Sequence, residues 1–243
     1  MGTPEGSLVY SNSVLYGVTV RGGVHDYGVI YKINADGSGY QKLLDFDNTN
    51  GNNPMSGLMI SGSTLYGTTT QGGSEGWGVL FKIDTTGNNF QVLHNFGSSG
   101  GINPQGTLQQ VGSTLFGMTG NGGNGSGVIY KINTDGNNYE VLYNFNNTDG
   151  RNPWGSLLPS NDKLYGHLPG GVYDYGVIFR INPDGSEFEK LQDFTTTNSG
   201  YDPHGALVLS SSAGYGVTTS GRCFQQRCNL QDPSGRFRLS NPV

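Results

Sequence analysis

Four short loops of this sequence vary between copies, and three of them place aromatic side chains beside acidic side chains. They read Val-His-Asp-Tyr over residues 24–27, Ser-Glu-Gly-Trp over 74–77, Asn-Gly-Ser over 124–126 and Val-Tyr-Asp-Tyr over 172–175. The flat face of an aromatic ring can stack on the C–H groups of a sugar, while nearby carboxylates and amides hydrogen-bond its hydroxyls. A proline recurs at positions 4, 54, 104, 153 and 203, and the residue that follows it also varies between copies. The predicted ligand-binding residues are therefore His25, Asp26, Tyr27, Glu75, Trp77, Trp154, Tyr173, Asp174, Tyr175 and His204.

The acidic members of this set also admit a catalytic interpretation. Glycosidic bonds are cleaved by paired carboxylates, and Asp26, Glu75 and Asp174 could form such a pair around a central channel. An active site in a repeat protein normally breaks the repeat symmetry with one unusual acidic cluster, and no such cluster stands out here. We therefore assign no catalytic residue and keep a carbohydrate-active hydrolase or lyase as an alternative.

The sequence predicts no metal site and no cofactor. The four histidines occupy different positions of a repeat, and no pair has a recognised zinc-ligand spacing. Two Asp- and Asn-rich segments, 45–51 and 146–150, carry the oxygen ligands that Ca²⁺ prefers, but they lack the closing glutamate of an EF-hand loop. Asn and Asp also form turns without any ion. Calcium at these segments is the alternative to a simple turn.

The loops belong to a repeat of about fifty residues. Its period is visible in a leucine at spacings of 50, 50, 49 and 50 residues, namely Leu8, Leu58, Leu108, Leu157 and Leu207. Periods of this length are typical of propeller blades or solenoids. We expect one domain over residues 1–243, with repeats at about 4–53, 54–103, 104–152, 153–202 and 203–243.

Each repeat contains four runs that alternate like β-strands. In the first copy these are residues 7–11, 14–20, 28–34 and 40–46, with an Asp-Gly turn at 36–37 between the last two. Short links without a helical period predict a four-stranded antiparallel meander. Four-stranded units repeated radially form a β-propeller. The predicted fold is thus all-β, a propeller of five blades whose fifth is incomplete or distorted.

Most of the repeated residues are predicted to be scaffold. A Gly-Gly pair ends the second strand in four copies, as at Gly22-Gly23, because only glycine turns the chain there with positive φ at no steric cost. Two aromatic columns are expected to pack between blades. They are Tyr16, Tyr66, Phe116, Tyr165 and Tyr215, and Phe46, Phe96, Phe145 and Phe194.

The end of the chain departs from the repeat. After Thr218 the fifth copy has no Gly-Val-Ile-Tyr-Lys-Ile run where one is due. Permitted codons from Arg222 onward, read one base later, can spell a matching third strand and turn. We hypothesise that residues 222–243 are a frameshifted repeat, which would make Cys223 and Cys228 accidents of the shift. Coding DNA incompatible with that reading would disprove the idea.

Composition excludes several classes of partner. The formal charge of −5 and the lack of a basic stripe argue against nucleic acid. No apolar run approaches the roughly 18 residues that span a membrane, so no membrane insertion is expected. Residues 1–20 lack the basic start and apolar centre of a secretory signal.

The motif Leu-Tyr-Gly-x-Thr-x-x-Gly-Gly, followed by Gly-Val-Ile-Tyr-Lys-Ile-Asn-x-Asp-Gly, resembles the GloVer-type bacterial tandem repeat. Residues 15–17, 22–23 and 28–37 carry it in the first copy, and the resemblance extends from residue 4 to about 221. It implies an extracellular or surface-displayed bacterial protein with no established catalytic residues to carry over. A looser similarity to kelch blades, whose second strand also ends in Gly-Gly, supports only the strand order.

The leading functional hypothesis is an extracellular, non-catalytic binding propeller. Its ligand would be a glycan or a cell-surface protein, bound on the face where the strand two–three loops and the inter-blade links emerge. An invariant scaffold with variable loops on one face is typical of binding propellers. The same loops could equally be ordinary exposed turns that drift between copies. A structural or adhesive segment of a larger surface protein is the second hypothesis.

Overall fold

The computed structural model describes residues 3–195, 201–210, 213–220, 227–229 and 238–240. Within those ranges every regular element is a β-strand, and no helix is long and apolar enough to cross a membrane. Four successive sheets each contain four antiparallel strands in chain order, as the sequence predicts. The first is β1 (Pro4–Ser11), β2 (Val14–Thr19), β3 (Val29–Asn34) and β4 (Gln41–Asp45).

The next three sheets repeat this meander. The second is β5 (Met59–Ser61), β6 (Thr64–Thr68), β7 (Val79–Asp84) and β8 (Gln91–Asn95). The third is β9 (Ile102–Val111), β10 (Thr114–Asn121), β11 (Val128–Asn133) and β12 (Glu140–Asn144). The fourth is β13 (Leu158–Ser160), β14 (Lys163–Leu168), β15 (Val177–Ile181) and β16 (Glu189–Asp193).

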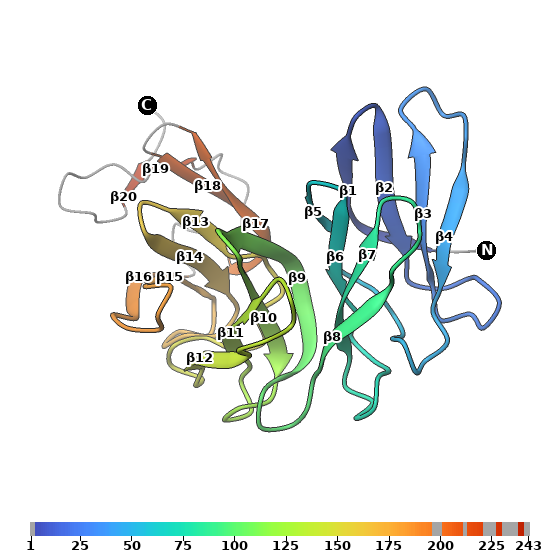
Figure 1. Ribbon diagram of the computed structural model, residues 1–243. Helices are drawn as coiled ribbons and strands as arrows, with labels where there is room; N and C mark the ends of the chain where they lie inside the picture. The colour runs from blue at the N-terminus through green and yellow to red at the C-terminus, as the bar shows by residue number, and fades with distance from the viewer. Residues whose placement is uncertain (1–2, 196–200, 211–212, 221–226, 230–237, 241–243) are drawn as a thin grey trace.

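The four sheets follow one another as blades around a common centre (Figure 1). The first strand of each blade is the innermost, because β1 contacts β5, β5 contacts β9, β9 contacts β13 and β13 contacts β17. In the second, third and fourth blades this arrangement leaves one face packed on the preceding blade and the other on the following one. We call these the incoming face and the outgoing face.

Close packing explains the glycine of the Leu-Tyr-Gly motif. In the second blade Gly67 pairs with Phe81 across β6 and β7, and the Phe81 ring lies over the glycine. A Cβ on Gly67 would stand 2.6 Å from Phe81 Cζ, which is well inside van der Waals contact. The glycine is therefore required by the neighbouring ring, without any need for an unusual φ.

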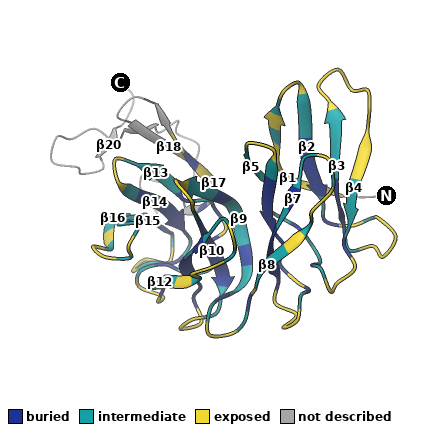
Figure 2. Ribbon diagram, in the orientation of Figure 1, coloured by how far each residue is buried: buried dark blue, intermediate teal, exposed yellow. Residues whose placement is uncertain are grey.

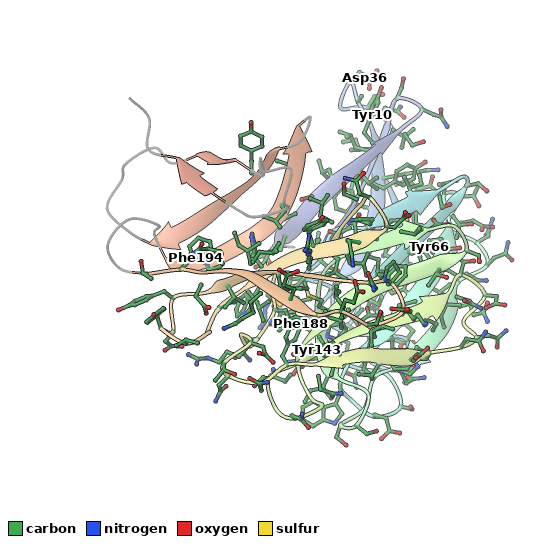
Figure 3. The ribbon with its side chains drawn as sticks, turned by 90° about the vertical axis from the view of Figure 1, so that its left-hand side faces the viewer. Tyr10, Asp36, Tyr66, Tyr143, Phe188 and Phe194 are labelled. Atoms are coloured by element: carbon green, nitrogen blue, oxygen red, sulfur yellow. The ribbon has the colours of Figure 1, made fainter. Side chains whose placement is uncertain are left out.

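The aromatic columns form the core between blades, as predicted. Phe46, Phe96 and Phe145 are fully buried. Each packs edge-to-face against an aromatic ring on the third strand of the next blade, namely Phe81, Tyr130 and Phe179. Further rings extend the stack, for example Tyr143 on Phe188 with centroids 4.0 Å apart (Figure 3). Buried residues accordingly concentrate on the central strands of the sheets (Figure 2). Edge-to-face and offset rings at these separations add stability beyond the area they bury.

Within the described residues the fifth repeat forms no four-stranded sheet, in agreement with the predicted incomplete or distorted blade. Its strands β17 (Tyr201–Ser210) and β18 (Ala213–Ser220) pair with each other, and Ala206 also forms an isolated bridge with Ser156 of the fourth repeat. Leu207 of β17 is buried against Phe194 and Ile178 of the fourth blade. Two short strands, β19 (Arg227–Asn229) and β20 (Arg238–Ser240), form a separate pair. Most of the segment 222–243, for which we hypothesise a frameshift, lies outside the described residues.

Candidate functional site

The strand two–three loops and the inter-blade links lie together on one face of the molecule. The link that leaves each of the first three blades donates a backbone N–H to the carbonyl of the last loop residue of that blade. We call these loops and links (24–27, 74–77, 124–126, 172–175 and 47–53, 97–103, 146–152) the loop face. The bonds are Asn53 to Tyr27 (3.1 Å), Asn103 to Trp77 (3.0 Å) and Asn152 to Ser126 (3.0 Å).

Tight backbone turns fix the start of each loop. Both glycines of the Gly-Gly pair have positive φ in all four blades, as with Gly22 (94°) and Gly23 (80°), which confirms their predicted structural role. The third position of the four-residue loops also has positive φ, at Asp26 (61°), Gly76 (78°) and Asp174 (63°). Gly, Asp and Asn tolerate this left-handed conformation better than other residues. The two aspartates are thus selected partly by the backbone.

A carboxylate or amide outside the loop holds its first residue. Asp45 Oδ1 accepts the Val24 N–H at 2.9 Å, and Asn95 Oδ1 accepts the Ser74 N–H at 2.8 Å. Asp193 makes the same bond at 3.2 Å in the fourth blade. We call these three residues the loop clamps. Each clamp immediately precedes a buried Phe of the column Phe46, Phe96 and Phe194. Because that Phe is packed between two blades, it also fixes the position of the clamp next to it.

The first clamp is ionised. Burial opposes ionisation of Asp45, but the Lys42 ammonium, 2.5 Å away, and the Val24 N–H outweigh that effect and lower the pKa of its carboxyl. Asn95 makes the same loop contact without a charge. The clamp therefore depends on the position of an acceptor oxygen, and its charge is incidental.

The loop aspartates have arginine partners. Asp26 accepts the Gly22 N–H at 2.8 Å and lies 3.5 Å from the Arg21 guanidinium. Asp174 lies 2.7 Å from the guanidinium of Arg151, a link residue. These contacts orient each carboxylate beside a cation, in contrast to the carboxylate pair that glycosidic cleavage would use.

Several predicted ligand-binding side chains are exposed on the loop face. Trp77 is 45% exposed and Tyr173 is 57% exposed, and Trp154, two residues beyond the third link, is 48% exposed. His25 and Glu75 are exposed beside them in their own loops. Aromatic rings presented on loops that a rigid scaffold positions are suited to ligand recognition.

Two other predicted residues are half-buried and contribute to packing. Tyr27 packs on the apolar cluster between the first and second blades, and Tyr175 packs on the cluster between the fourth and fifth. His25 stacks on Tyr27 with ring centroids 6.5 Å apart. The side chain of His204 lies outside the described part of the structure.

The Asp- and Asn-rich links use their side-chain oxygens to form turns. Asp47 Oδ1 accepts the Thr49 hydroxyl at 2.7 Å and the Asn50 N–H at 2.9 Å. The bond from Thr49 lowers the pKa of the Asp47 carboxyl. Asn146 makes the corresponding bonds to Thr148 and Asp149 in the third blade. Among the described residues, no group of three or more His, Cys, Asp or Glu could hold a metal ion.

The loop clamps and Arg151 were not among the residues predicted from sequence. The clamps had a signal, since Asp or Asn precedes the invariant Phe in four repeats at positions 45, 95, 144 and 193. Arg151 had none, because its partner Asp174 lies 23 residues away in a different blade.

Many solved structures resemble this one, and three of them illustrate the likeness. The first is of a nidogen/laminin complex, with TM-score 0.60, 16% identity and coverage of 89% of this chain and 71% of that chain. The second is a putative TolB from Agrobacterium tumefaciens, with a TM-score of 0.58, 18% identity and coverage of 98% of this chain and 79% of that chain. The third is an oligogalacturonate lyase in complex with manganese, with a TM-score of 0.64, 14% identity and coverage of 98% of this chain and 66% of that chain. At these identities the likeness shows the fold alone, and it confirms the predicted β-propeller.

Sequence comparison supplies the family. Among curated proteins, none matches this sequence. A family model described as the Gloeobacter/Verrucomicrobia repeat matches residues 1–166 and, in an overlapping match, residues 114–226. This coverage confirms the predicted GloVer-type resemblance over nearly the whole repeated region. The chain belongs to the Gloeobacter/Verrucomicrobia repeat family.

Proposed function

We propose that this protein is an extracellular, non-catalytic binding module whose loop face recognises a glycan. The observation that carries the proposal is the pair of exposed aromatic rings Trp77 and Tyr173 on the loop face, with Trp154 exposed just beyond the third link. Each ring presents a flat apolar surface beside polar groups, which is the combination that a sugar ring requires.

Rigidity of the loops supports the proposal further. The clamp at Asn95 and the backbone bond from Asn103 fix both ends of the loop that carries Trp77. A side chain that is already held in place loses less conformational freedom when a ligand binds, so more of the contact energy is available for affinity. The ion pairs of Asp26 and Asp174 hold hydroxyl-binding carboxylates in the other two four-residue loops.

A glycan array separates this proposal from its alternatives. We expect the protein to bind a subset of glycans and Trp77→Ala to weaken that binding by roughly tenfold or more, the effect of losing at least about 1.4 kcal/mol. Tyr10→Ala is the matched control, because Tyr10 is an exposed aromatic at the opposite end of the first blade, beside Asp36 (Figure 3).

The other outcomes are equally informative. Equal losses in the two variants, or no binding to any glycan, would contradict the proposal. Capture of a defined cell-surface protein that Trp77→Ala abolishes would assign the loop face to a protein ligand. Release of reducing ends from a bound glycan, lost in Asp174→Asn, would favour an enzyme.

A further inference from the structure

The incoming face of the first blade is exposed, whereas its counterparts in the other blades are buried. Leu8 is 52% exposed, but Leu58 at the same repeat position is 4% exposed. Tyr40 is 62% exposed, while Phe90 at that position packs into the junction between the first two blades. Together with Tyr10 and Tyr31, these residues form what we call the open face (Leu8, Tyr10, Tyr31 and Tyr40).

The open face already has the ring geometry of a complete junction. In the second blade Phe81 and Phe90 lie 5.6 Å apart, and Phe46 of the preceding blade meets Phe81 at 5.5 Å. The third and fourth blades repeat this trio with Phe96 and Phe145 as the incoming rings. On the open face the corresponding pair, Tyr31 and Tyr40, lies 5.8 Å apart. What this pair lacks is the third ring.

A hollow marks where a preceding blade would sit. It measures about 490 Å³ and is lined by Thr19, Gly22, Gly23, Val29, Tyr31, Tyr40 and Lys42. At the next junction the equivalents of Thr19 and Val29 are Thr69 and Val79, and Gly51 of the link is seated against both. Gly101 lies in the same way against Thr119 and Val128. The hollow is thus the seat that a link glycine and a junction Phe fill elsewhere in this molecule.

The segment that fills a junction has a recognisable sequence. In three complete junctions the filling Phe follows Asp or Asn and stands eight residues before the proline that starts the next blade. The sequence after residue 195 contains no Phe preceded by Asp or Asn. A second copy of the chain does not supply one either, because Phe46, Phe96, Phe145 and Phe194 are all buried in its own junctions.

We infer that the open face is a docking seat for one kind of partner, a further blade of the same repeat. The partner inserts the Asx-Phe end of its fourth strand between Tyr31 and Leu8 and lays its link glycine on Thr19 and Val29. The other junctions specify the chemistry of this partner, since each is an apolar, aromatic sheet face followed by a Gly-containing link. An interface of this kind is heterologous, with two different surfaces in contact.

A covalent graft tests the seat on the full chain. Residues 104–152 are duplicated and joined directly to Pro4, which places the Phe of the added copy eight residues before that proline, as in the natural junctions. We expect the added blade to slow nitration of Tyr40 and Tyr10 by roughly tenfold and to raise the urea midpoint of the first blade. The matched control carries Phe145→Ser in the added copy only.

Each result decides the question. Protection in the graft that disappears in the Phe145→Ser control supports the seat. An added copy that leaves Tyr40 and Tyr10 as reactive as in the parent chain overturns it, whether or not that copy folds. In a third outcome, the parent chain sediments as a dimer that Tyr40→Glu dissociates. That result would show that a second copy of the chain binds the open face, and it would also overturn the proposal.

Discussion

His94 is a titratable residue whose surroundings disfavour its protonated, charged form. Its ring stacks on Tyr139 with centroids 3.7 Å apart and meets the edge of Phe96. Burial among these rings lowers the pKa of His94 from 6.5 to about 4. The neutral imidazole is therefore part of the aromatic packing between the second and third blades.

The protein should lose stability in mild acid because of this residue. Between pH 6.5 and about 4 the unfolded chain binds a proton at His94 that the folded chain does not, so the free energy of unfolding falls as the pH falls through that window. His94→Tyr should reduce this loss of stability with falling pH and should preserve the ring stacking on Tyr139. Tyr143, at the same repeat position in the third blade, stacks on Phe188 in this way. Urea unfolding at pH 7.0, 5.5 and 4.5 measures both proteins; parallel curves would contradict the assignment.

At the residue scale, the sequence predicted structural roles better than exposure. The Gly-Gly pairs and the Phe column could be assigned because every copy repeats them for a steric reason. The half-buried state of Tyr27 and Tyr175 could not, because it depends on rings supplied by a neighbouring blade. A loop position that varies in sequence can still be part of the packing.

The loop between the second and third strands acts as a unit held at both ends. Asn95→Ala removes the acceptor of the Ser74 N–H and should cost about 1 kcal/mol, with faster hydrogen exchange at Ser74. Asn95→Asp should restore protection, since Asp45 and Asp193 clamp the equivalent loops. If Asn95→Ala left the exchange of Ser74 unchanged, the clamp would have no mechanical role.

Strand order and turns could be predicted because they depend on local sequence. Alternating apolar residues and an Asp-Gly pair placed the four strands of the first repeat within a few residues of their observed ends, and Gly37 has the expected positive φ of 85°. The clamps and the Arg151–Asp174 pair join segments about twenty residues or more apart. Spacing in the sequence does not reveal such contacts until the turns bring the segments together.

The whole molecule is a chain of junctions, and each blade depends mainly on its neighbours. Leu58→Ala should therefore cost about 2–5 kcal/mol, because the leucine fills the junction between the first two blades. Leu8→Ala, at the same repeat position, should change stability by within about 0.5 kcal/mol, because Leu8 is exposed. Thermal or urea unfolding of the two variants gives the comparison. Similar costs would mean that the first blade is covered in solution.

Radial packing of repeats was predictable from their period, and the incomplete fifth repeat from its missing motif. The uncovered face of the first blade was not, because its residues are as apolar or aromatic as their buried counterparts. Leu8 and Leu58 hold the same repeat position, and Leu58 is buried because a preceding blade packs on it. Burial in a repeat protein is a property of position in the array.

The positive φ in the middle of each loop limits how this surface can diversify. Only Gly, Asp or Asn fits that position at low cost, whereas the residue before it is already His25, Glu75 or Tyr173. A combinatorial library should hold the Gly-Gly pair, the clamp and this one site fixed and randomise the flanking sites. Variation would then change the chemistry presented to a target and leave the backbone that presents it intact. The repeat is in this sense a ready scaffold for selecting new binders.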